Sequence, residues 1–150
     1  KTIGLANYFF MFLSAGFFVN MLSKTKFIQI IQNVFMNYHE HTFLLYTLIG
    51  GYFFIIAFLG FHPLVSIVLL AEILNPLLPI ISSFPLTILL VITSLSAVLY
   101  SPFNLSTIIL ANEIERNTIR VGGWNILFAI FLISMAILFS YTLHIISSSI

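Results

Sequence analysis

The chain has 150 residues, of which 61% are hydrophobic and only 6% carry a charge, and its mean hydropathy is +1.17. Soluble domains have roughly 25% charged residues, so this composition excludes an ordinary water-facing surface. The five basic residues form no patch that could grip the phosphates of a nucleic acid, and the absence of cysteine excludes disulfides and thiolate metal sites.

The remaining class is a helical membrane protein. A helix that crosses the hydrocarbon core of a bilayer needs about 20 mostly apolar residues, so the chain has room for roughly five crossings. We expect an all-α, polytopic transmembrane domain over residues 1–150, embedded in the plasma membrane of a prokaryote. Because the chain begins at Lys1 rather than at a methionine, we expect it to be a fragment of a longer permease.

The first third of the chain predicts two spans joined by an interfacial helix. Residues 3–22 form an apolar span, and Lys24 and Lys26 after it favour a cytoplasmic interface. Residues 27–37 have apolar side chains at helical spacing and amides on the opposite face, which is typical of an amphipathic helix lying in the interface. The second span, residues 43–61, ends where proline disfavours helix at the preceding residue.

The middle of the chain is apolar but interrupted. Residues 64–81 predict a helix to about Leu74 and then an irregular stretch, because Pro76 and Pro79 each remove a backbone donor. Residues 86–100 predict a short further span.

The last third contains an apolar stretch, residues 103–111, that is too short to cross a bilayer. The following residues, 112–120, are polar and must reach water, and Gly122-Gly123 precedes the final span over residues 124–146.

The basic residues conflict with a simple count of crossings. With Lys24 and Lys26 inside, Arg116 and Arg120 would lie outside, against the tendency of basic residues to remain in the cytoplasm. The conflict disappears if residues 64–81 form a re-entrant hairpin. It also disappears if residues 103–111 and the end of the fourth span are two halves of a broken crossing. We therefore expect a broken or non-spanning element between residues 60 and 112.

Interrupted helices are also where a membrane protein can bind a solute. Backbone released from helical bonding must be buried in protein or line a wet cavity, and secondary transporters use such places as binding sites. Three segments of the chain have this character: GFHP at 60–63, NPLLP at 75–79 and SPFN at 101–104.

Glu72 is the most informative single residue, because a carboxylate inside an apolar segment is costly unless it is protonated, paired or hydrated. It predicts a cation or proton site to which Asn75, three residues later on the same helix face, would contribute. The alternative is a position near the interface, where the cost disappears.

Further candidates lie at the other two breaks. His62 is a possible proton-linked group or a loop histidine. Asn104, Ser106 and Thr107 offer neutral donors and acceptors for a solute or ion. Thr93, Ser94 and Ser96 could extend that lining or only join helices. We expect no resident cofactor or metal, because His39-Glu40-His41 lacks a third ligand, and only Na⁺ or H⁺ as a coupling ion.

The segments GFHP at 60–63, SPFNLST at 101–107 and RVGGWN at 120–125, in this order of elements, resemble one inverted-repeat half of an ion-transporter-superfamily permease. The resemblance implies that the chain is the C-terminal half of a transporter, that broken helices hold a solute and a coupling ion, and that the protein works as a dimer. The Ser-Asn-Thr sequence that marks dicarboxylate members is absent, which leaves the substrate class open.

We therefore expect a non-enzymatic part of an ion-coupled secondary transporter for a small solute, an anion by the resemblance, working by alternating access. Its partners would be the bilayer, the solute and the rest of the permease or a partner subunit. One alternative is a non-transporting membrane subunit for assembly or anchoring. Another is an intramembrane lipid-modifying enzyme, for which Glu113, Glu115 and Arg116 are the available acid and base groups.

Overall fold

The computed structural model describes residues 2–61 and 63–148, and within these ranges the chain is helical with no strand. The elements in chain order are α1 (Thr2–Ser23), α2 (Lys26–Asn37), α3 (Thr42–Phe58), α4 (Pro63–Leu74), the 3₁₀ turn η1 (Asn75–Leu77), α5 (Ser83–Tyr100), α6 (Leu105–Glu113), α7 (Thr118–Trp124) and α8 (Ile126–Ser148). The all-α expectation is confirmed.

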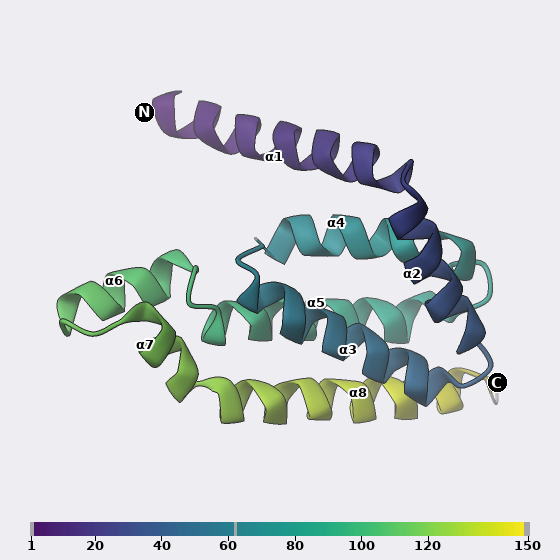
Figure 1. The fold of residues 1–150 in the computed structure, drawn as a ribbon. Helices are drawn as coiled ribbons and strands as arrows, with labels where there is room; N and C mark the ends of the chain where they lie inside the picture. Colours follow the sequence, from purple (N-terminus) through teal and green to yellow (C-terminus); the bar gives the residue numbers. More distant parts are fainter. Residues whose placement is uncertain (1, 62, 149–150) are drawn as a thin grey trace.

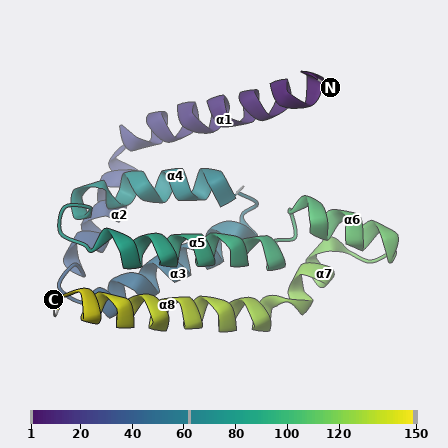
Figure 2. The same ribbon diagram turned by 180° about the vertical axis from the view of Figure 1, so that it is seen from behind.

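The long helices α1, α3, α4, α5 and α8 run side by side between two ends of a bundle, and successive ones point in opposite directions (Figures 1 and 2). Helix α5 is central and packs against α3, α4 and α8, whereas α1 packs against α4 and α2. We call the end that holds α2, η1 and the C-terminal part of α8 the α2 end. The opposite end, which holds α6, α7 and the α3–α4 connection, is the α6 end (Figure 1).

Several predicted elements are present with nearly the predicted bounds. The amphipathic helix over residues 27–37 is α2, which buries Ile28 and Phe35 and packs against α4 and η1. The helix predicted from residue 64 to Leu74 is α4, and the irregular stretch after it contains η1.

The point where α3 ends and the point where α6 begins are each determined by local interactions. Gly60, with a φ of 84°, follows α3, and the N–H groups of Gly60 and Phe61 donate to the carbonyls of Ala57 and Ile56. This is a Schellman motif, which needs a left-handed residue that glycine supplies without strain. Helix α6 begins after Asn104, whose side-chain oxygen accepts from the Ser106 N–H and so caps the helix.

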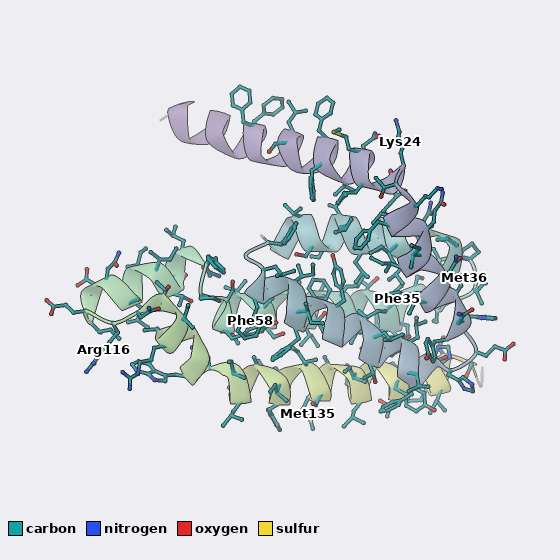
Figure 3. The ribbon with its side chains drawn as sticks, viewed as in Figure 1. Lys24, Phe35, Met36, Phe58, Arg116 and Met135 are labelled. Atoms are coloured by element: carbon teal, nitrogen blue, oxygen red, sulfur yellow. The ribbon has the colours of Figure 1, made fainter. Side chains whose placement is uncertain are left out.

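The prediction that residues 64–81 form a re-entrant hairpin is wrong. Helix α4 begins at the α6 end and finishes at the α2 end, so residues 64–81 do not return to the side they left (Figure 1). The broken crossing is present only in part. Helices α5 and α6 are separate pieces, but α6 continues beyond α5 and packs against α7. Consequently Lys24 and Arg116 lie at opposite ends of the bundle (Figure 3), and the conflict between the two basic pairs remains.

Helix α7 was not predicted, because Gly122-Gly123 reads as a break before the last span. The two glycines instead lie within α7, where Gly122 is buried against the end of α5. A Cβ at Gly122 would stand 2.5 Å from the Tyr100 carbonyl oxygen, so this close contact between two backbones requires glycine.

Two helical stretches in the described part of the chain are long and apolar enough to cross a membrane, judged by length and composition. They are residues 83–113, which begin with α5 and continue through the break into α6, and Ile126–Ser148, which is α8. The apolar helix Thr42–Phe58 and the stretch Val65–Leu77 are shorter.

Candidate functional site

A cavity of about 530 Å³ lies toward the α6 end, where α3 finishes beside α4, α5 and the start of α6. Its apolar walls come from Ala57, Ile67, Leu95, Ala97, Val98 and Leu105. The cavity is large enough for a small organic molecule.

Two of the three predicted breaks border this cavity. Gly60 and Phe61, which follow α3, form one wall, and Ser101, Phe103 and Asn104, which join α5 to α6, form another. The Phe103 ring packs against Gly60, where a Cβ would stand 3.1 Å from Cδ2 of that ring. The two breaks therefore contact each other, although some 40 residues separate them in the sequence.

Three polar side chains on the walls are held by the backbone. Ser94 donates to the Val91 carbonyl at 2.9 Å, and Ser101 donates to the Ala57 carbonyl at 2.8 Å. Asn104 donates to the Val98 carbonyl at 3.1 Å. Because each hydroxyl proton is already used, the two serines offer a ligand oxygen lone pairs, and Asn104 retains its second N–H.

Helix α6 begins on the cavity wall, with Leu105 as its first residue. The N-terminus of a helix carries a partial positive charge and unpaired N–H groups, which favour an anion. Among the described wall residues none is charged, so this helix end and the neutral polar groups set the electrostatics.

The structure divides the predicted site residues between the two ends. Asn104 lies on the cavity wall. Ser106 and Thr107 follow it on α6 but do not line the cavity; Ser106 is exposed and Thr107 is buried. His62 lies outside the described residues.

Glu72 and Asn75 are at the α2 end, in the last turn of α4 and in η1. Glu72 is half-buried near α2, and its backbone carbonyl accepts from the Gln32 side chain at 3.0 Å; Asn75 is exposed. Glu72 is nine residues from the start of α4, about 14 Å along the helix, and does not line the cavity. The structure therefore does not bring Glu72 together with Asn104.

The hydroxyl groups of α5 fall into two sets, one on the cavity wall and one bonded within the helix, and the sequence could not predict this division. Ser94 lines the cavity, whereas Thr93 donates to the Leu89 carbonyl and Ser96 to the Thr93 carbonyl within the helix. The apolar wall residues and Ser101 were missed as candidates, and only their nearness to the two breaks could have pointed to them.

The groups considered for enzymatic chemistry do not line this cavity. Glu113, Glu115 and Arg116 are exposed around the α6–α7 connection, away from the cavity. No group of three potential metal ligands comes together in the described ranges.

Comparison of the chain with protein-family models, curated proteins and solved structures finds no match.

Proposed function

We propose that the chain is an integral membrane protein whose helices α1, α3, α4, α5 and α8 cross the bilayer. The apolar surface of α8 supports this proposal. Its large hydrophobic residues face outward, among them Leu127, which is 81% exposed, and Met135, whose side chain points away from the bundle (Figure 3). The buried side of α8 instead carries Ala129, Ile133 and Ala136. An apolar outer face is costly in water and favourable in lipid.

The short helices fit the two interfaces of such a bilayer. Helix α2 exposes Lys26 and most of its amides at one end of the bundle. Helices α6 and α7 and their connection, at the other end, combine exposed Leu105 and Trp124 with exposed Arg116 and Arg120. Mixed apolar and basic surfaces of this kind suit the headgroup region, where aromatic rings and basic side chains are favourable.

We propose further that the protein is part of an ion-coupled secondary transporter that works by alternating access. The observation that carries this proposal is the cavity bordered by two helix breaks and by the N-terminus of α6. Its apolar walls favour a solute with an apolar body, and the end of α6 favours one anionic group. A small apolar carboxylate has both properties. The rest of the permease or a second copy would complete the path.

The test is electrogenic transport by the full-length gene product in proteoliposomes, measured on a solid-supported membrane with carboxylates from acetate to benzoate. We expect a current with the more apolar members. Val98→Phe, which fills the cavity, should abolish it, whereas Leu138→Phe on the exposed face of α8 should not. An unchanged current in Val98→Phe would show that the cavity is not the route.

A non-transporting assembly subunit is the second candidate, and the surface of α1 favours it. Among the described residues this helix packs mainly on α4 and α2, and it exposes Phe9, Phe10 and Phe17. That face could cover a partner helix as well as contact lipid. Correct insertion without current for any tested carboxylate, together with co-purification of a membrane partner lost in Phe17→Ala, would favour this function.

A further inference from the structure

The α3–α8 contact at the α2 end contains unsatisfied polar groups. Among the described residues, the buried side-chain atoms without a hydrogen-bond partner are the Tyr46 hydroxyl, the Ser140 hydroxyl and Nδ1 of His144. All three belong to α3 and α8. Buried polar groups almost always have partners, so these three orphans call for an explanation such as a bound water.

The register of the two helices explains why these groups meet. Thr42 of α3 lies opposite His144 of α8, with 3.2 Å between Oγ1 and Nε2. Farther along the same pair, Gly50 lies against Ile133 and Ile137. Because the helices are antiparallel, moving one turn along α3 from Thr42 to Tyr46 corresponds to moving back one turn along α8, from His144 to Ser140. The level of the orphan groups is therefore fixed by contacts on both sides of it.

The side chains at this level are enclosed. Tyr46 and Ser140 are both 0% exposed. The Tyr46 ring lies edge to face with the His144 ring, with centroids 6.3 Å apart. His144 is half-buried and also lines a second cavity of about 380 Å³, whose walls include Glu40, His41, Thr42 and Tyr141. This second cavity, which we call the mouth, lies at the α2 end, and His144 is the member of the three that lines it.

We propose that Tyr46, Ser140 and His144 form a hydrated proton-binding site, in which the three side chains hold a water molecule and His144 takes up a proton from the mouth. A buried water makes about three hydrogen bonds to groups that otherwise lack partners, which matches the number of orphans. The proposal does not depend on solute transport.

The three orphan atoms can each bond the water in both charge states. When the imidazole is neutral, Nδ1 accepts from the water, and the two hydroxyls donate to the water. When a proton from bulk water reaches the ring, both nitrogens donate: Nε2–H to Thr42 Oγ1, and Nδ1–H to the water. The water then donates to the two hydroxyl oxygens. One water proton is unused in the neutral state, and the two hydroxyl protons are unused in the charged state.

The charged and titratable groups around the site are few. Glu40 and His41 lie at the mouth, Tyr46 faces His144 from α3, and Tyr141 lies on α8. Helix α5 contributes no charged side chain. The start of α3 and the end of α8 meet here, so their opposite dipoles offset each other.

Thermal stability tests the water. Tyr46→Phe and Ser140→Ala each remove one oxygen atom. If that oxygen bonds water, its loss should lower Tm by roughly 2–4 °C. Ser134→Ala, the same change at an exposed position of α8, is the matched control and should not alter Tm. If the site is dry, removing an orphan hydroxyl raises Tm or leaves it unchanged, and that result would overturn the proposal.

Nuclear magnetic resonance tests the proton. In the full-length protein labelled with ¹⁵N-histidine, the His144 signals are those lost in His144→Gln. Their chemical shifts should change with pH, and this response should differ from the wild type in Tyr46→Phe and Ser140→Ala but not in Ser134→Ala. No response to pH, or the same response in all variants, would rule out the site whether or not the protein transports a solute.

Discussion

Gly50 of α3 lies so close to Ile133 of α8 that a Cβ at position 50 would stand 2.9 Å from Cγ2 of Ile133. Gly51, the next residue, has no atom within 4 Å of the corresponding position and is exposed. The two adjacent glycines therefore have different roles. The first permits close packing of α3 on α8, as small residues do at helix contacts in membranes, and the second does not.

This difference predicts opposite tolerance to the same substitution. Gly50→Leu should destabilise the fold by about 1–3 kcal/mol or more, because the added side chain must displace Ile133 and Ile137. Gly51→Leu should be neutral or slightly stabilising, because leucine favours a helix more than glycine does. Unfolding of both variants in mixed micelles gives the comparison, and equal losses would mean that α3 and α8 do not pack at Gly50.

The contact between α7 and the end of α5 predicts a second matched pair. Gly122→Ala would place a methyl group 2.5 Å from the Tyr100 carbonyl oxygen, and a backbone atom cannot move aside without shifting a helix. We expect a loss of about 1–3 kcal/mol in unfolding free energy. Gly123→Ala, with no atom within 4 Å, should be tolerated. Equal stability of the two variants would contradict the position of α7.

Asn104 and Asn117 each cap a helix, but only Asn104 has a second bond in the structure described. Asn104 accepts from the Ser106 N–H and donates to the Val98 carbonyl, whereas the Asn117 side chain accepts from the Ile119 N–H. Asn117→Ala should cost roughly 1 kcal/mol of unfolding free energy, and Asn104→Ala should cost more. Asn104→Asp keeps the cap and loses the donor, so chemical unfolding of this variant separates the two bonds.

We expect that Glu72 does not contribute to solute binding in the cavity. Glu72→Gln keeps the size of the side chain and changes a group at the α2 end, so the affinity for a carboxylate found in the transport assay should stay within about twofold, which is under 0.5 kcal/mol. Asn104→Ala, which removes the free N–H donor on the cavity wall, should weaken the same affinity. A larger loss for Glu72→Gln than for Asn104→Ala would place the carboxylate of Glu72 near the solute.

The helix boundaries could be predicted because their causes are local. Gly60 ends α3, Pro76 falls where α4 gives way to η1, and Pro102 lies in the connection after α5. The amphipathic pattern of α2 was equally visible. Helix α7 could not be predicted, because Gly122 reads as a break until its contact with Tyr100 is known.

The site was less predictable, because it depends on how distant segments meet. The spacing of Glu72 and Asn104 gives no indication that α4 carries Glu72 away from the cavity. The contact between Thr42 and His144 joins residues 102 positions apart, which no local pattern can reveal. The two breaks that border the cavity were predicted as sites one at a time, and their contact at Gly60 and Phe103 comes only from the fold.

The central claim is that α3, α4 and α5 each cross the bilayer, and labelling of single cysteines tests it most directly. The chain has no cysteine, so Asn37→Cys and Asn112→Cys each introduce one exposed thiol, at the α2 end and the α6 end respectively. Three crossings lie between these positions. A membrane-impermeant maleimide added to sealed vesicles of one orientation should label one variant, and vesicles of the opposite orientation should show the reverse. Labelling of both variants from the same side would contradict the account.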